Sequence, residues 1–286
     1  MQNFLERRPT LWRCADATLE FADKPLVMGI LNATPDSFSD GGEHASLEAA
    51  LAWARRLRSD GADIIDVGGE STRPGASPVP LSIERERVMP LVRALAAEGF
   101  VVSVDTSKPE IMLEAAANGA KILNDTRGFS LPGAKEAAAA TGCGLVVMHW
   151  ADVKAMTDNA VMTKTVFDWL LQRRNALAAA GADLGRIALD PGLGFGKRPE
   201  QTFALLAALP ELVGEGSPVL IGISRKKSLE WAIGRETAPK ERDAATAAVS
   251  VLAAERGAAV VRVHDVLGSA DALAVRAKVS GLTIKN

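Results

Sequence analysis

The amino-acid sequence predicts an α/β protein, a (β/α)8 TIM barrel with a short N-terminal extension. Short apolar runs rich in Val, Ile and Leu recur along the 286 residues, and each ends in polar residues or glycine. A longer stretch rich in Ala, Leu, Glu and Arg follows each run. A strand followed by a helix, repeated eight times within about 250 residues, is the layout of this barrel.

Eight of these runs are predicted to be strands. Several are continuously apolar rather than alternating, which is typical of parallel strands that are buried on both faces. An open doubly wound sheet is the alternative arrangement of the same elements. The predicted strands comprise residues 26–31, 63–67, 100–104, 121–123, 144–148, 186–189, 218–223 and 258–263.

The stretches between the strands carry helix signals. Ser46 is a typical N-cap for a helix that runs through Ser59. Pro109, Pro199 and Pro239 each lie at or just before the expected start of a later helix, where proline is well tolerated. Because every strand is followed by a helix, the carboxyl ends of all strands are expected at one end of the barrel.

The first 24 residues precede the first predicted strand. We expect residues 1–24 to form an extension, as a short hairpin or a plug at the bottom of the barrel. Residues 25–286 are expected to form the barrel domain, because no low-complexity segment divides them.

Composition excludes several classes of protein. The 33 Lys and Arg residues nearly balance the 35 Asp and Glu residues, which argues against a nucleic-acid partner. Two cysteines, Cys14 and Cys143, are too few for a disulfide framework or a zinc cluster and suit a reducing compartment. Neither a secretory signal nor an apolar run of about 18 residues is visible, so we expect a cytoplasmic protein without a membrane partner.

Hydrogen-bonding residues follow the predicted strands, where the active sites of such barrels lie. Asp105, Asn124 and Asp190 come at the ends of neighbouring or nearby strands. Two carboxylates and an amide suit a heterocycle that presents several N–H donors. Each residue alone could instead cap the helix that follows it.

A second group of residues at the strand ends is cationic. It comprises Arg73, Lys226, Arg262 and His264. Arg262 and His264 are two positions apart on a strand, so their side chains point the same way. Because guanidinium and ammonium groups bind phosphate oxygens, this group predicts a phosphate-bearing substrate. The alternative is that these cations pair with local acids such as Asp265 and Glu70.

The glycine-rich stretch 190–197 matches neither of two phosphate-binding fingerprints. A P-loop would need a glycine at Pro191 and Ser or Thr at Arg198, and a dinucleotide fingerprint would need Gly or Ala at Lys197. Its backbone could still approach a planar ligand closely. His149, after the fifth strand, is more typical of a structural histidine than of a ligand.

Histidine and cysteine are not clustered at a spacing that binds a metal. A Mg²⁺ ion could still enter with a pyrophosphate and be held by few protein oxygens. Asn32, at the end of the first predicted strand, is the best-placed candidate to contact it.

Together these motifs resemble the dihydropteroate synthase family, in the order in which that family carries them. The segments at residues 28–42, 66–75 and 189–197 are long and highly specific. The shorter matching segments are residues 103–110, 124–125, 148–149, 224–226 and 262–265.

The resemblance implies a homodimeric barrel that condenses (7,8-dihydropterin-6-yl)methyl diphosphate with 4-aminobenzoate and releases pyrophosphate. It implies that the pterin is bound by Asp105, Asn124, Asp190 and Lys226. It assigns the diphosphate to Thr72, Arg262 and His264, with Asn32 on Mg²⁺.

Two loops are implied to close over the site and to form much of the aminobenzoate pocket. They carry Asp36 and Phe38, and Thr72, Arg73 and Pro74. No protein nucleophile is needed if the diphosphate leaves in an SN1-like step. Asp105, Asp190 and, in the closed loop, Asp36 would then favour the cationic pterin.

The sequence departs from the family pattern after Ser224-Arg225-Lys226, where Lys227 replaces a usual serine. Our hypothesis is that Lys227 adds a cation near the aminobenzoate carboxylate. Trp150, which stands where methionine is frequent, and residues 126–129 are also unusual. Two other functions remain open: a pterin-dependent methyltransferase barrel and a non-catalytic pterin-binding paralogue.

Overall fold

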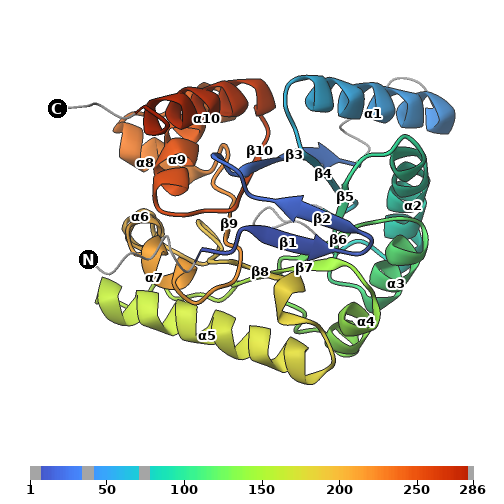
Figure 1. Ribbon diagram of the computed structural model, residues 1–286, viewed down its shortest axis with the longest axis horizontal. Helices are drawn as coiled ribbons and strands as arrows, with labels where there is room; N and C mark the ends of the chain where they lie inside the picture. The colour runs from blue at the N-terminus through green and yellow to red at the C-terminus, as the bar shows by residue number, and fades with distance from the viewer. Residues whose placement is uncertain (1–7, 34–41, 71–77, 283–286) are drawn as a thin grey trace.

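The computed structural model describes residues 8–33, 42–70 and 78–282. Its main sheet has eight strands in the order β8-β7-β6-β5-β4-β3-β10-β9, and all neighbouring pairs are parallel (Figure 1). A parallel bridge between Leu189 and Val219 joins the two ends of this order, so the sheet is a nearly closed barrel rather than an open sheet. The strands are β3 (Leu26–Asn32), β4 (Ile64–Gly68), β5 (Val102–Asp105), β6 (Ile122–Asp125), β7 (Gly144–Met148), β8 (Ile187–Asp190), β9 (Leu220–Ile221) and β10 (Val260–Val263).

Helices surround the barrel (Figure 1). Alternate strand residues such as Ile65 and Val67 face these helices and form the larger core with them. The α-helices are α1 (Gly42–Ser59), α2 (Leu81–Ala97), α3 (Pro109–Ala117), α4 (Ala134–Ala140), α5 (Asn159–Ala179), α6 (Pro199–Ala207), α7 (Leu209–Val213), α8 (Lys227–Ile233), α9 (Asp243–Glu255) and α10 (Val266–Ser280). Among the described residues there are also two short 3₁₀ helices, η3 (Leu184–Arg186) and η4 (Pro239–Arg242).

Most helix starts agree with the sequence signals. Pro109 and Pro199 begin α3 and α6, and Pro239 begins η4, which leads directly into α9. The helix α1 differs, because it begins at Gly42 and Ser46 therefore lies inside it. The intervening residues include good helix formers such as glutamate and alanine, which continue the helix.

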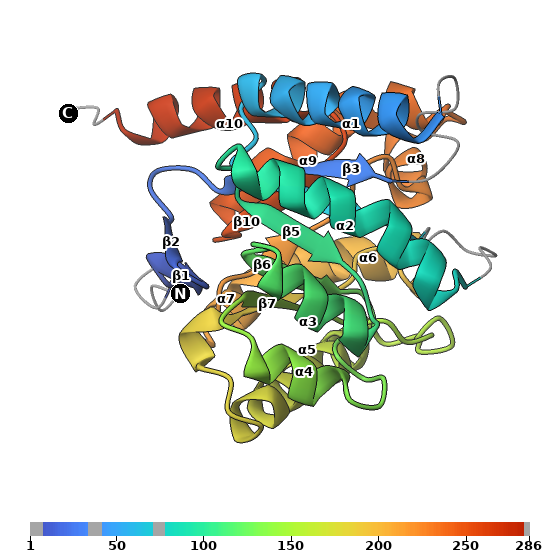
Figure 2. The ribbon, with the colours of Figure 1, turned by 90° about the vertical axis from the view of Figure 1, so that its right-hand side faces the viewer.

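The N-terminal extension contains an antiparallel hairpin of β1 (Leu11–Cys14) and β2 (Ala17–Glu20). Trp12 and Cys14 are fully buried against the apolar side chains that fill the lower barrel. The Trp12 Nε1–H donates to the carbonyl of Arg186 over 2.7 Å. In Figure 2 the arrows of β3 and β5 point away from this hairpin, so it plugs the end of the barrel opposite the strand ends.

The barrel interior changes from apolar to polar along its axis. Side chains on a strand alternate, so every second residue points inward. The inward residues near the hairpin are apolar and include Ile64, Ile122, Ala188 and Val260. The next inward residues on the same four strands are Asp66, Asn124, Asp190 and Arg262. The barrel interior therefore has an apolar layer next to the hairpin and a polar layer toward the carboxyl ends of the strands.

Candidate functional site

Arg262 on β10 is held by two carboxylates from other strands. Its Nε–H donates to Asp66 Oδ2 on β4 over 2.7 Å, and its Nη2–H donates to Asp105 Oδ2 on β5 over 3.1 Å. The Asn124 amide nitrogen on β6 donates to the same Asp66 oxygen over 3.3 Å. Four side chains from four strands are thus joined inside the barrel.

Burial changes the acidity of this group. It raises the pKa of Asp105 to about 8, because Arg262 offsets only part of the cost of desolvation and Asp66 adds repulsion. Burial alone would lower the pKa of Arg262, but Asp66 and Asp105 raise it above its ordinary value. Arg262 therefore stays charged, while burial favours the protonated form of Asp105.

Asp190 and Lys226 form the other half of the polar layer. Asp190 Oδ1 accepts from the backbone N–H of Gly192 over 2.7 Å, and burial raises the pKa of this carboxyl despite nearby Lys226. The Lys226 ammonium donates to the carbonyls of Leu193 and Gly222, both over 2.6 Å, and lies 4.0 Å from the centroid of the Phe195 ring. Burial lowers the pKa of Lys226 to about 7, although Asp190 opposes this effect.

We refer to Asp66, Asp105, Asp190, Lys226 and Arg262 as the inner cluster. Its members come from β4, β5, β8, β10 and the N-cap of α8, where Lys226 lies, and Asn124 lies beside Asp105 in the β5–β6 register. The predicted acceptors and the predicted cations Lys226 and Arg262 are therefore brought together. Arg262 pairs with two acids inside the barrel, Asp66 and Asp105, rather than with Glu70 or Asp265 as the alternative proposed.

His264 and Asn32 lie at the edge of the barrel mouth. Both line one cavity of about 500 Å³ that also borders Trp53 and Arg225. His264 Nδ1 is 2.9 Å from Ser224 Oγ, and its backbone N–H donates to the same oxygen over 3.1 Å. This hydroxyl fixes the imidazole beside the end of β9.

Lys227 is the first residue of α8 and is exposed, whereas the preceding Lys226 is partly buried. Five other predicted site residues lie outside the described residues. These are Asp36, Phe38, Thr72, Arg73 and Pro74.

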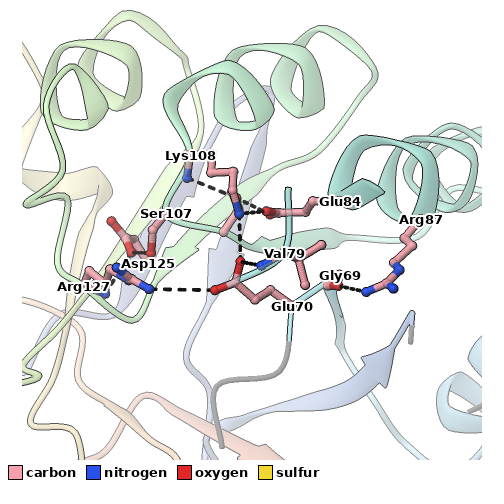
Figure 3. Close-up of polar contacts among 10 residues, drawn as sticks. Gly69, Glu70, Val79, Glu84, Arg87, Ser107, Lys108, Asp125 and Arg127 are labelled. Atoms are coloured by element: carbon pink, nitrogen blue, oxygen red, sulfur yellow. Dashed lines mark hydrogen bonds and ion pairs between the residues drawn. The ribbon is translucent and has the colours of Figure 1, made fainter. Parts of the chain in front are cut away.

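A second charged group, which we call the outer cluster, lies between the strand ends and the helices (Figure 3). It consists of Glu70, Glu84 and Lys108. The Lys108 ammonium contacts Glu70 Oε2 at 2.8 Å and also Glu84 Oε2. Thr106 Oγ1 donates to Glu84 Oε1 over 2.5 Å, and the Val79 N–H donates to Glu70 Oε2 over 3.1 Å. Glu70 therefore binds a backbone N–H nine residues further along the chain.

The glycine-rich stretch packs against the loop that follows β7 rather than forming a phosphate loop. Gly192 has a φ of +67°, and a Cβ there would lie 2.1 Å from the carbonyl oxygen of His149. Lys197 Nζ is 3.1 Å from His149 Nδ1 and donates to the Phe195 carbonyl over 2.9 Å. Burial and the nearby charge of Lys197 lower the pKa of His149 to about 3, so the neutral ring serves as a structural element.

Sequence reasoning missed Asp66 as a site residue. It searched the residues that follow each strand, and Asp66 lies within β4, two positions before its end. An aspartate in the middle of an apolar run was the available signal, because an unpaired buried carboxylate is costly.

The described residues contain no group of three or more His, Cys, Asp or Glu side chains that could hold a metal. A Mg²⁺ ion with one protein oxygen, such as that of Asn32, would take its other ligands from water and substrate. Among the helices that the structure describes, none is long and apolar enough to cross a membrane.

Comparisons with known proteins agree on one family. A model of the family described as "Pterin binding enzyme" matches residues 28–264. Dihydropteroate synthase of Escherichia coli strain K12 is 44% identical over 256 residues, which cover 88% of this chain and 90% of that protein.

Two solved structures extend this similarity to the fold. Xanthomonas albilineans dihydropteroate synthase with 4-aminobenzoic acid has a TM-score of 0.90 and 45% identity, covering 96% of this chain and 100% of that one. Burkholderia cenocepacia dihydropteroate synthase complexed with 7,8-dihydropteroate has a TM-score of 0.87 and 43% identity, covering 96% and 97%.

Proposed function

The chain belongs to the dihydropteroate synthases among the pterin-binding enzymes, and we propose that its two substrates meet above the inner cluster. The reaction joins the methylene of (7,8-dihydropterin-6-yl)methyl diphosphate to the amine of 4-aminobenzoate and releases pyrophosphate. One observation carries the proposal for the site. Asp105, Asn124 and Asp190 converge from three strands around Arg262 and Lys226.

We propose that Asp105, Asn124, Asp190 and Lys226 bind the pterin ring. Three of these groups can accept hydrogen bonds from ring N–H donors, and the Lys226 ammonium can donate to a ring acceptor. Asp105 and Asp190 are buried, so their interaction with positive charge is stronger than it would be in water. A ligand that donates to both carboxylates would favour their ionised forms over the protonated forms that burial favours.

Arg262 and His264 are proposed to hold the diphosphate, together with Thr72. Asp66 and Asp105 already take two N–H donors of Arg262, so the carboxylates fix the direction in which the remaining guanidinium edge faces. Cations at this position stabilise the leaving pyrophosphate, whose negative charge grows as the bond to the methylene breaks.

The chain supplies placement and electrostatics rather than a covalent intermediate. As the diphosphate leaves, positive charge develops on the methylene and the pterin ring. Asp105 and Asp190 stabilise that charge, and we expect Asp36 to contribute. The aminobenzoate nitrogen then forms the new bond and loses its proton. We expect Phe38, Arg73, Pro74 and Lys227 to bind aminobenzoate and to exclude water.

We propose that Mg²⁺ enters with the diphosphate and that Asn32 contacts it. An amide oxygen is a suitable ligand for this hard cation. When bound, the ion neutralises part of the charge on the leaving group.

An assay of pyrophosphate release tests this function. The chain is mixed with the pterin diphosphate, 4-aminobenzoate and Mg²⁺, and release is expected only when both substrates are present. Binding of the pterin without turnover would favour a non-catalytic paralogue. Methyl transfer that requires a corrinoid protein would favour a methyltransferase.

We also propose a cytoplasmic homodimer. Both cysteines are free, as is usual in a reducing compartment. Helices α9 and α10 pack on each other and expose Leu252, Val275 and Val279, which could pair with a second copy. Sedimentation is expected to show a dimer that Val275→Lys with Val279→Lys converts to a monomer, and an unchanged mass would contradict this interface.

A further inference from the structure

Asp66 is the most deeply buried acid of the inner cluster. Its side chain has no exposed surface, and it lies within β4 beside Ser103 of β5. Its Oδ2 accepts from the Arg262 Nε–H over 2.7 Å and from the Asn124 amide over 3.3 Å. One oxygen therefore connects two side chains from strands on either side of it.

The contact with Asn124 determines how that side chain faces a ligand. A carboxylate can only accept hydrogen bonds, so Asn124 must turn its amide nitrogen toward Asp66. The Asn124 carbonyl oxygen is then directed away from Asp66. Without Asp66 the amide could rotate by half a turn and exchange an acceptor for a donor at the ligand.

The contact with Arg262 fixes the plane of the guanidinium. Two carboxylates on different strands hold Nε and Nη2, so the group cannot rotate without losing one of them. The pKa of Asp105 is raised to about 8 by burial, and a protonated carboxyl is the weaker partner for Arg262. Asp66, at the shorter distance, is then the main constraint.

A purely structural role does not account for this arrangement. Buried carboxylates that stabilise a fold usually have both oxygens bonded, because an unpaired one is costly. Within the described part of the chain, Asp66 Oδ1 is buried and has no hydrogen-bond partner. The buried Asp66 carboxylate therefore costs stability, and the hydrogen bonds of its Oδ2 go to two site residues, Arg262 and Asn124.

We propose that Asp66 is a positioning residue for the pterin diphosphate. It turns the carbonyl of Asn124 toward the ligand and holds Arg262 in one plane, and it does so without contacting aminobenzoate. The inference rests on the function proposed above.

The first test is Asp66→Asn, which keeps the shape of the side chain but removes its charge. The KM for the pterin diphosphate is expected to rise by about tenfold or more, while the KM for 4-aminobenzoate stays within about twofold. The matched control is Ser103→Ala. Ser103 is equally buried on the neighbouring strand, and its hydroxyl has no hydrogen-bond partner among the residues that the structure describes, so the KM for the pterin diphosphate should not change.

The second test exchanges the two polar groups. Asn124→Asp alone places two carboxylates against each other and is expected to raise the KM for the pterin diphosphate by about tenfold or more. Adding Asp66→Asn restores a donor and an acceptor across the contact, so the double variant should recover part of the loss. This rescue also provides the readout if Asp66→Asn alone fails to fold.

The outcomes separate this inference from the proposed function. A pterin KM within about twofold of the parent in folded Asp66→Asn, or the absence of rescue in the exchange, overturns the role of Asp66. A parent chain that releases no pyrophosphate overturns the function itself. In that case binding of (7,8-dihydropterin-6-yl)methanol to the parent and to the variants still measures the effect of Asp66.

Discussion

The inner and outer clusters both hold cations between carboxylates, and they differ in how completely their hydrogen bonds are made. In the outer cluster, each carboxylate oxygen of Glu70 and Glu84 has a partner. Glu70 Oε1 forms an ion pair with Arg127 at 3.8 Å, and the other three oxygens accept hydrogen bonds from Lys108, Val79 and Thr106. In the inner cluster, Asp66 Oδ1 is buried without a partner in the described residues.

The difference distinguishes a group that supports the fold from one that binds a ligand. Lys108 contacts both glutamates, whose interactions raise its pKa although burial opposes them. Burial instead raises the pKa of Asp105 and Asp190 and lowers that of Lys226. Buried groups whose pKa values are strongly shifted are typical of functional sites.

The largest expected effect belongs to the inner cluster. Asp190→Asn should lower kcat by about 100-fold, because the variant no longer stabilises positive charge on the pterin. Its melting temperature should stay close to that of the parent, since burial already favours the neutral form of Asp190. Steady-state kinetics and a thermal melt measure the two effects, and near-normal turnover would remove Asp190 from the mechanism.

The outer cluster should respond in the opposite way. Lys108→Met leaves Glu70 and the buried Glu84 without their shared cation and should lower the free energy of unfolding by about 2–3 kcal/mol. Urea denaturation measures this loss. The control, Lys121→Met, breaks an ion pair with the exposed Asp16 and should have a much smaller effect. Comparable stability for the two variants would contradict the structural role of the outer cluster.

The pH dependence of stability sharpens the contrast. The pKa of Asp105 is about 8 in the fold and 3.8 for an ordinary aspartate, so between about pH 4 and 8 the folded state holds a proton that the unfolded state lacks. Stability contributed by this proton is present at low pH and is lost as the pH rises toward 8. Between pH 5.5 and 8, Asp105→Asn should reduce the fall in unfolding free energy by about 3 kcal/mol. Urea denaturation of parent and variant at several pH values measures this difference. The same change of unfolding free energy with pH in both proteins would contradict the assignment.

The smallest effect is expected at an exposed cation outside both clusters. Lys227 is screened by water, so Lys227→Ser should raise the KM for 4-aminobenzoate only about twofold to threefold. The KM for the pterin diphosphate serves as the internal control and should not change. An unaltered aminobenzoate KM would contradict a contact between Lys227 and that carboxylate.

The sequence was sufficient to predict the barrel and most described members of its polar layer. Strand periodicity and the position of strand ends located Asp105, Asn124, Asp190 and Arg262, because parallel strands end on one side. Periodicity could not reveal which of these side chains contact one another. Arg262 and Asp66 are 196 positions apart, and their pairing depends on how the strands close around the axis.

Other features depended on packing that no local pattern encodes. The pairing of Lys197 with His149 joins two loops, and the glycines that permit it resemble those of a phosphate loop. Asp66 lies inside an apolar run, so the rule that site residues follow the strands did not identify it. The prediction that His149 is structural rested on its isolation in the sequence, and its burial beside Lys197 agrees with that reading.

The hairpin at the base of the barrel affects the order in which ligands bind and leave. Trp12 and Cys14 fill the floor, so the polar layer is reached from the opposite end. Ligands that enter from the end opposite the hairpin bind in an order, since the one that lies deepest arrives first and leaves last. The pterin, bound on the inner cluster, would then be the first molecule in, and the finished product would have to withdraw along the path by which aminobenzoate came.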